Sequence, residues 1–455
     1  MRVLLAISIS LSISFLLASC SLMPDWVGGE SEVKLPGERI SVLPSKSDLV
    51  ADETLNGVDV ALPPAAINTV WLGENFGRIY NLALASNIEE KESFDIGNEP
   101  SDKTQRILST PIVVKDLFYA LDGEGVITAR EIANLDKELW QADLKAETFK
   151  EGYWGFAEGV KKQKFIGGRI AYGNNMIFAT TLAGEVAAFD ARRGYEVWRR
   201  SFNLPIKSAP VVDGNSLYFI TINNKTYSVD ASDGKTLWTH SGISETTGIL
   251  GSPAPVVYET AILVPYSSGE IYVIRKQDGS VIWGDSLAAL NVRNASYFSL
   301  NDIDATPLLH KDVVYAVGHE GVLTATEIKT SRRIWEKEIS SLKTPALAGD
   351  FLFLLTTNDE LVCIHVPDGK IKWVASLPSF ADEENKRDKI SWNGPVIAGD
   401  MLYITNSIGE MRVISPQDGE TKRIIEIEEK VFLPPIVSDR KMYILSNEAN
   451  LTIFE

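Results

Sequence analysis

A ten-residue motif recurs along the chain and constrains its fold more than any other feature. Phe189–Trp198 and Val229–Trp238 both read apolar-Asp-Ala-x-x-Gly-x-x-x-Trp. Asp278–Trp283 and Asp368–Trp373 repeat the second half of the motif. Weaker copies end at Trp140 and Trp335, and in a further copy Arg423 stands where the Trp is expected. Neighbouring copies lie roughly 40 to 60 residues apart, which indicates that one supersecondary unit is repeated along the chain.

Each repeat contains signals for four short strands. A small residue and Pro open the unit, as in Ser208-Ala209-Pro210, and an apolar run such as Leu217–Ile220 follows. An alternating stretch such as Glu270–Ile274 and an Asp-Gly turn then lead to the strand that carries the Trp. The hydrophobic period stays near two, and no amphipathic helix is indicated.

Counting the opening strands predicts eight repeats. They begin near residues 109, 168, 208, 253, 305, 344, 394 and 434. A four-stranded sheet with two apolar faces must bury both, and a radial arrangement of sheets does this. We therefore expect an all-β fold, an eight-bladed β-propeller of four-stranded antiparallel blades, over residues 65–455. The last repeat lacks its outer strand, which Ala66–Trp71 is expected to supply.

The amino terminus predicts export and a lipid anchor. Met1-Arg2 precedes an apolar run over Val3–Leu17, which is typical of a signal peptide over residues 1–19. Leu17-Ala18-Ser19-Cys20 resembles the bacterial lipobox, so Cys20 is expected to be acylated; the alternative is an ordinary signal peptide in which Cys20 is incidental. Residues 20–64 are polar and acidic with Gly and Pro, and predict a flexible tether.

Composition argues against several classes of function. A net charge of −17 disfavours binding to nucleic acid, which needs a basic face. The four His, at positions 240, 310, 319 and 365, lack metal-ligand spacing, and no serine-hydrolase elbow is present. Cys363 would be the only thiol left after acylation and is expected to be packed and inert. No catalytic, cofactor-binding or metal-binding residue is therefore predicted.

The repeat resembles that of pyrroloquinoline quinone enzymes, and a lipobox ahead of one eight-bladed ring resembles the BamB family. These are lipoprotein subunits of the outer-membrane β-barrel assembly (BAM) machine. The resemblance implies a non-catalytic scaffold that assists the assembly and insertion of β-barrel proteins. It implies a BamA-like barrel insertase and other BAM subunits as partners, with unfolded β-barrel clients as further candidates. Ser21 after Cys20 favours the periplasmic face of the outer membrane, where the acylated Cys20 would insert into lipid.

The resemblance also implies a partner-binding site. Asn301–Pro307 is similar to the family's acidic entry to a blade, which implies that Asp302 and Asp304 contact BamA. The neighbouring loop falls at Thr246–Ser252, where Ile249 and Leu250 would add an apolar contact; the family's Arg is missing there. The alternatives are that the Asp pair caps turns and that Ile249 and Leu250 pack inside a blade. The loops at Gln141–Lys164 and Ser376–Trp392 are further candidate contacts.

Two other functions remain open. A quinoprotein dehydrogenase would bind pyrroloquinoline quinone and calcium over the channel, and the family resemblance implies a vicinal Cys pair that this chain cannot form. A ligand-sensing propeller would use the central channel. Exposed sheet edges could also accept an extended client segment by β-augmentation.

Overall fold

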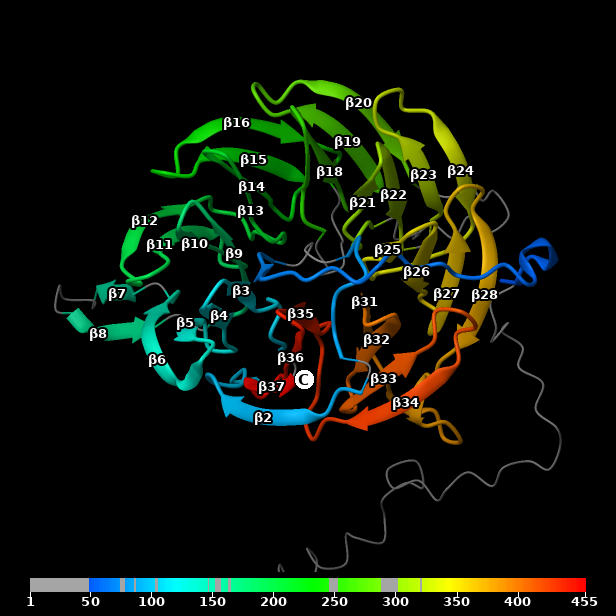
Figure 1. The fold of residues 1–455 in the computed structure, drawn as a ribbon. Coiled ribbons are helices and arrows are strands. Elements are labelled where there is room, and N and C mark those ends of the chain that lie inside the picture. Colours follow the sequence, from blue (N-terminus) through cyan, green and yellow to red (C-terminus); the bar gives the residue numbers. More distant parts are fainter. Residues whose placement is uncertain are drawn as a thin grey trace, which may run out of the picture. The chain divides into compact units, whose positions relative to one another are not determined.

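A computed structural model describes the chain from Leu49 to Glu455, except residues 74–77, 86, 103–104, 146, 152–156, 163–164, 245–252, 288–301 and 320. The compact unit spans Asp48–Glu455. Within the described residues, the regular structure is almost entirely β-strand, and the one helical element is the single 3₁₀ turn η3 (Glu53–Leu55). Eight four-stranded antiparallel blades form a propeller, as predicted (Figure 1).

Seven blades follow one another along the chain, each from its inner to its outer strand. Blade 1 comprises β3 (Ile112–Val114), β4 (Leu117–Leu121), β5 (Val126–Glu131) and β6 (Asn134–Asp143); blade 2 comprises β9 (Gly168–Gly173), β10 (Met176–Thr181), β11 (Glu185–Asp190) and β12 (Glu196–Ser201). Blade 3 comprises β13 (Val211–Asp213), β14 (Ser216–Ile220), β15 (Lys225–Asp230) and β16 (Thr236–Ser241); blade 4 comprises β17 (Val256–Tyr258), β18 (Ala261–Pro265), β19 (Glu270–Arg275) and β20 (Val281–Ser286).

Blade 5 comprises β21 (Leu308–His310), β22 (Val313–Val317), β23 (Leu323–Glu327) and β24 (Arg333–Lys337); blade 6 comprises β25 (Ala346–Ala348), β26 (Phe351–Leu355), β27 (Glu360–His365) and β28 (Lys370–Ser376). Blade 7 comprises β31 (Trp392–Ala398), β32 (Met401–Asn406), β33 (Glu410–Ile414) and β34 (Thr421–Glu426). Two hairpins lie outside the blades: β7 (Glu147–Glu151) with β8 (Ala157–Lys162), and β29 (Phe380–Asp382) with β30 (Arg387–Lys389).

Blade 8 joins the two ends of the chain, but its outer strand is not the expected one. The C-terminal strands β35 (Ile436–Ser438), β36 (Lys441–Leu445) and β37 (Asn450–Phe454) pair with β2 (Glu90–Asp95). The expected Ala66–Trp71 segment instead gives β1 (Val70–Trp71), which pairs with β3. The physical reason is burial: an outer strand is exposed, which suits the charged β2, whereas Trp71 is fully buried near the axis.

The recurrent tryptophans connect neighbouring blades by hydrogen bonds. In six outer strands the indole Nε1 donates to a backbone carbonyl of the next blade at 2.6–2.9 Å: Trp140 to Ala191, Trp198 to Ala231, Trp238 to Lys276, Trp283 to Ile328, Trp335 to Val366 and Trp373 to Pro416. At five of these six junctions a turn glycine of the next blade makes room for the indole; a Cβ on Gly194, for example, would lie 2.5 Å from Trp140. Ser331 takes the glycine's place in blade 5. Between blades 7 and 8, Arg423 stands at the position of the tryptophan, and its Nη2 donates to the Ile88 carbonyl at 3.1 Å.

A β-bulge lies directly before the Trp in each outer strand that carries one. In blade 2, Ala188 pairs with Trp198 and Phe189 pairs with Glu196, so Val197 is left out of the register. A bulged residue on an edge strand points away from the ladder. In blades 1 to 5 this residue is an exposed aliphatic: Leu139, Val197, Leu237, Ile282 or Ile334.

The N-terminal part of the compact unit crosses one face of the ring, and we call residues 58–85 the N-terminal strap (Figure 1). It contacts turns between first and second strands: Asp439 donates its N–H to the Asn68 carbonyl in blade 8, and Lys115 donates to Thr69 in blade 1. Gly399 of blade 7 donates to Leu82. Residues 49–64, which the sequence assigned to the tether, therefore include packed chain, since Leu55 and Val60 are buried.

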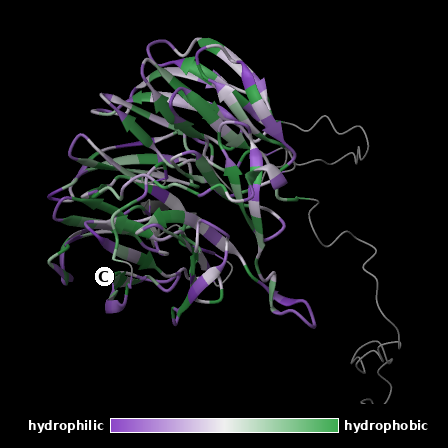
Figure 2. Ribbon diagram, turned by 45° about the vertical axis from the view of Figure 1, so that its right-hand side comes forward, coloured by the Kyte–Doolittle hydropathy of each residue, from purple (hydrophilic) through white to green (hydrophobic). Residues whose placement is uncertain are grey.

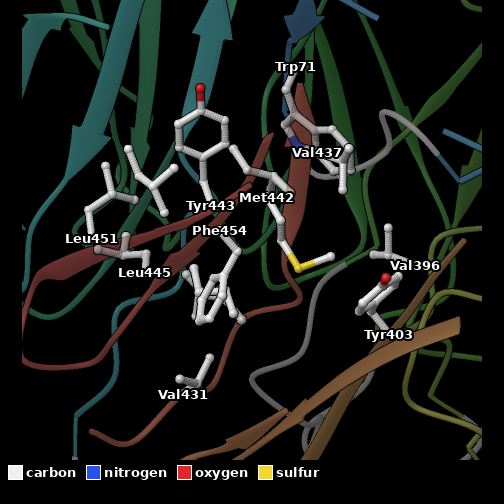
Figure 3. Packing of buried hydrophobic residues seen from close by; sticks show 14 of the residues in the cluster. Trp71, Val396, Tyr403, Val431, Val437, Met442, Tyr443, Leu445, Leu451 and Phe454 are labelled. Atoms are coloured by element: carbon white, nitrogen blue, oxygen red, sulfur yellow. The ribbon is translucent and has the colours of Figure 1, made fainter. Parts of the chain in front are cut away.

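Apolar side chains fill the spaces between blades. Figure 2 shows that most strands are hydrophobic and that many turns are hydrophilic. The largest cluster combines the strap, blade 7 and blade 8; in Figure 3, Trp71 lies beside Val437, with Met442 and Tyr403 nearby. The strap thus belongs to the same core that closes the ring.

Candidate partner-binding site and central channel

Asp302 and Asp304 lie just before β21, where the chain enters blade 5. Both side chains are buried, with 1% and 7% of their surface exposed. The Asp302 carbonyl accepts a hydrogen bond from the His319 N–H at 2.8 Å. Thr306 ties the segment to both neighbours, because its Oγ1 accepts from the Ala254 N–H at 3.0 Å and its N–H donates to the Thr344 Oγ1 at 3.1 Å. The segment therefore joins blades 4, 5 and 6.

Other residues predicted to bind partners fall outside the described residues. These are Ile249 and Leu250, together with Cys20 and the signal peptide. The loop Gln141–Lys164 is described only in part and contains the hairpin β7–β8. The loop Ser376–Trp392 contains the hairpin β29–β30 and ends at the buried Trp392, whose Nε1 donates to the Pro378 carbonyl at 2.9 Å.

Cations from other blades act on the charge of Asp304. Burial, followed by the Asp302 charge, raises the pKa of Asp304 to about 7, while Lys207, Lys343 and Arg169 act in the opposite direction. Lys207 is 4% exposed, and burial lowers its pKa. Since these residues come from blades 2, 3, 5 and 6, their interaction places them around the axis of the ring.

Sequence reasoning missed these cations, although a signal was present. Lys207, Asp304 and Lys343 each stand two or three residues before the Pro that opens a blade. The same position in successive repeats points to the axis, so charges found there converge even when they are far apart in the sequence. Their separation in the chain, and the absence of any local motif, concealed the cluster.

Two further contacts attach cations to blade 7. The Lys343 Nζ donates to the Asn393 Oδ1 at 2.8 Å. The Arg78 Nη1, which comes from the strap, donates to the Pro395 carbonyl at 2.8 Å. Asn393 and Pro395 are two residues apart on β31, so the two cations approach the same short stretch of strand.

The described residues around the axis do not match a calcium site. Among the described residues, no group of three His, Cys, Asp or Glu could hold a metal ion. Cys363 is fully buried inside blade 6, and burial raises its thiol pKa well above the ordinary value. Lys343 and Arg78 would also repel a divalent cation, so the described side chains around the axis do not fit a calcium ion. Within the part of the chain that the structure describes, no helix is long and apolar enough to cross a membrane.

Comparison with known proteins identifies the relatives. A family model described as outer membrane protein assembly factor BamB matches residues 123–375, more than half of the chain. The BamB of Yersinia pestis is 27% identical over 259 residues, which are 57% of this chain and 63% of that protein. The chain thus aligns with less than two thirds of that relative's length.

Solved structures share the fold at low identity. BamB from Moraxella catarrhalis superposes with a TM-score of 0.63 and 18% identity, covering 81% of this chain and 100% of that one. A europium-containing methanol dehydrogenase superposes with a TM-score of 0.60 and 13% identity, covering 81% and 87%. At these identities the likeness establishes the propeller alone.

Proposed function

Because the chain belongs to the family of the outer membrane protein assembly factor BamB, we propose that it is a non-catalytic scaffold subunit of the BAM complex. In this role it assists the assembly and insertion of β-barrel proteins at the periplasmic face of the outer membrane. Family membership over more than half of the chain is the observation that carries the proposal. The acylated Cys20 would hold the ring at the membrane.

The structure of the ring suits a scaffold. Six tryptophan hydrogen bonds connect consecutive blades, and blade 8 is built from both ends of the described chain. Such a body changes shape little when a partner docks, which lowers the entropic cost of binding.

The proposed contact with a BamA-like insertase includes Asp302, Asp304, Ile249 and Leu250. Since both Asp side chains are buried, their contribution would be to hold the first segment of blade 5 in a binding shape. The bonds of Thr306 to blades 4 and 6 support this role.

The test is affinity capture of the lipidated chain from membranes. Recovery of barrel-assembly subunits is expected, and recovery of none would count against the scaffold. The double variant Asp302→Ala with Asp304→Ala should weaken capture by at least tenfold. Thermal unfolding of the same variant serves as the control, because a variant that no longer folds would also lose capture. Folded protein with unchanged capture would refute the site.

The anchor has its own test. The variant Cys20→Ser should abolish incorporation of labelled palmitate and release the protein from membranes. Labelling that persists in the variant would contradict the lipobox assignment.

A quinoprotein dehydrogenase is the second candidate, since the methanol dehydrogenase superposes over 81% of this chain. Adding pyrroloquinoline quinone and calcium should give no dye-linked oxidation of alcohols. A calcium-dependent rate would overturn the non-catalytic proposal.

A further inference from the structure

The centre of the ring contains more cations than carboxylates. Five cations (Arg78, Arg106, Arg169, Lys207 and Lys343) and two carboxylates (Asp302 and Asp304) are the described charges that interact there. This excess is notable because the whole chain carries a net charge of −17. A buried charge without a partner of opposite sign is costly, so a described cation that lacks such a partner is a candidate to bind an anion.

Arg78 and Lys343 are the least compensated of these cations. Arg78 is 5% exposed, and one hydrogen bond of its guanidinium is seen among the described residues, to the Pro395 carbonyl. Its Nε has no partner there. Lys343 contacts the neutral Asn393 side chain. Neither cation forms an ion pair with a described carboxylate.

The two cations are also close enough to act on each other. Their anchors on β31, the Asn393 side chain and the Pro395 carbonyl, are two residues apart. Burial, together with the Arg106 and Arg78 charges, lowers the pKa of Lys343 to about 8, while Asp304 opposes this shift. Burial alone lowers the pKa of Arg78 to about 10. Two like charges therefore lie near each other, one buried (Arg78) and one partly buried (Lys343).

We propose that the central channel binds a small oxyanion, a phosphate or carboxylate group, between Arg78 and Lys343. The unused N–H groups of the guanidinium and the ammonium would donate to its oxygens, and such charge-assisted hydrogen bonds are the strong ones. Asn393 holds Lys343 in place, so it acts as a positioning residue. The site is independent of the scaffold role, because it uses no residue proposed to bind the insertase.

The test is isothermal titration of the full chain with sodium phosphate at pH 6.5 and constant ionic strength. Saturable binding of one phosphate is expected, and Lys343→Met should weaken it at least tenfold. Lys343→Arg keeps the charge and should retain binding, which guards against a variant that merely misfolds. Lys235→Met, at an exposed rim lysine, is the matched control and should bind as the original does. No saturable phosphate binding, or equal binding in Lys343→Met, would overturn the proposal.

Two further arms identify the source and the charge of the ligand. Sodium acetate should compete, as expected for an oxyanion site. Vesicles of phosphatidylglycerol should not displace bound phosphate, because Arg78 is buried and Lys343 partly buried, which keeps both from a flat lipid surface. Displacement would assign the cations to a lipid surface and refute the channel site. Binding of acetate, which stays a monoanion throughout, should weaken as pH rises from 6.5 to 9, because Lys343 then loses its proton and Asp304 gains charge among Asp302, Lys207, Arg169 and Arg106. Affinity that stays constant across this range would contradict the proposal.

Capture of barrel-assembly subunits separates the two hypotheses. Lys343→Met should leave capture unchanged while it abolishes phosphate binding. Loss of capture in this variant with intact phosphate binding would refute the assignment of Lys343 to the oxyanion.

Discussion

Asp304 is a buried carboxylic acid that interacts with cations from several blades. The sequence placed it correctly at the start of blade 5, but it suggested an exposed surface. The structure buries the carboxylate, and both of its oxygens lack a hydrogen-bond donor among the described residues. Burial could not be predicted because it depends on Lys207, Lys343 and Arg169, which lie on other blades.

Stability should therefore depend on pH through Asp304. Its pKa is about 7 in the folded chain and 3.8 in the reference state, so between pH 4 and 7 the unfolded chain releases a proton that the folded chain keeps. The free energy of unfolding contributed by this group is highest below pH 4 and falls as pH rises to 7. At pH 8, Asp304→Asn should be more stable than the original by up to about 4 kcal/mol, and the difference should vanish near pH 4.

Urea unfolding at pH 4 and pH 8 measures this difference. Asp136→Asn, at an exposed aspartate in blade 1, is the control and should show no pH-dependent change. A stability difference for Asp304→Asn that is the same at both pH values would contradict the buried, protonated carboxylate.

The tryptophans show which residue-scale features a repeat reveals. Their contact area at blade junctions was predicted from the repeat, because six of them share one position in it. The hydrogen bond from each indole to the next blade was not predicted, because its acceptor is a carbonyl roughly 30 to 50 residues away in the sequence. Nor did the sequence reveal that the preceding residue bulges out of the strand.

Substitutions at Trp238 should separate these contributions. Trp238→Phe keeps an aromatic ring but loses the 2.7 Å bond to the Lys276 carbonyl, and should destabilise the fold by about 1 kcal/mol. Trp238→Ala should cost about 3–5 kcal/mol, because it also leaves a cavity. Urea unfolding measures both. Leu237→Ala, at the neighbouring exposed bulge, should change stability by less than about 0.5 kcal/mol; equal losses at both positions would contradict the junction role.

At the scale of the element, the closing strand was the one the sequence misplaced. Hydrophobicity favoured Ala66–Trp71, yet the ring takes the charged β2 as its outer strand. An outer strand faces solvent on its free edge and along much of its surface, so its sequence carries little apolar signal. The apolar pair Val70–Trp71 goes to the interior instead, where Trp71 joins the core of blades 7 and 8.

An engineered disulfide can test this pairing. Ser93 and Thr452 lie directly opposite each other on β2 and β37, at a separation that a disulfide can span. The double variant Ser93→Cys with Thr452→Cys should oxidise readily and raise the free energy of unfolding by about 2–4 kcal/mol. A shift in mobility on non-reducing gels reports the bond. The pair Thr69→Cys with Thr452→Cys represents the closure expected from the sequence and should not crosslink; the reverse result would contradict the observed closure.

For the molecule as a whole, the sequence predicted the class, the number of blades and the position of each inner strand to within a few residues. Regular repeats made this possible, because every copy confirms the others. The N-terminal strap was not predicted, since residues 58–85 lack the repeat: their first part was assigned to the tether and Ala66–Trp71 to the outer strand of the last blade. Their structure arises from contacts with turns of several blades, which no local pattern records.

Truncation should reveal where the folded body begins. Removal of residues 1–47 leaves the compact unit whole and should leave its thermal unfolding temperature unchanged. Removal of residues 1–95 also takes away β2, Trp71 and Leu82, and should abolish a single cooperative transition. Calorimetry and limited proteolysis measure the outcome. A sharp unfolding transition in the chain that lacks residues 1–95 would contradict the role of β2, Trp71 and Leu82 in closing the ring.

The strap makes the two openings of the ring unlike. Its backbone forms hydrogen bonds with turns of blades 1, 7 and 8 at one end of the ring, so main chain covers part of that end. The opposite mouth carries the first residues of the blades and the charged side chains behind them. A ligand therefore reaches the axis more easily from the end without the strap. Any complex that forms around the ring is asymmetric along this axis because of a segment that belongs to no blade.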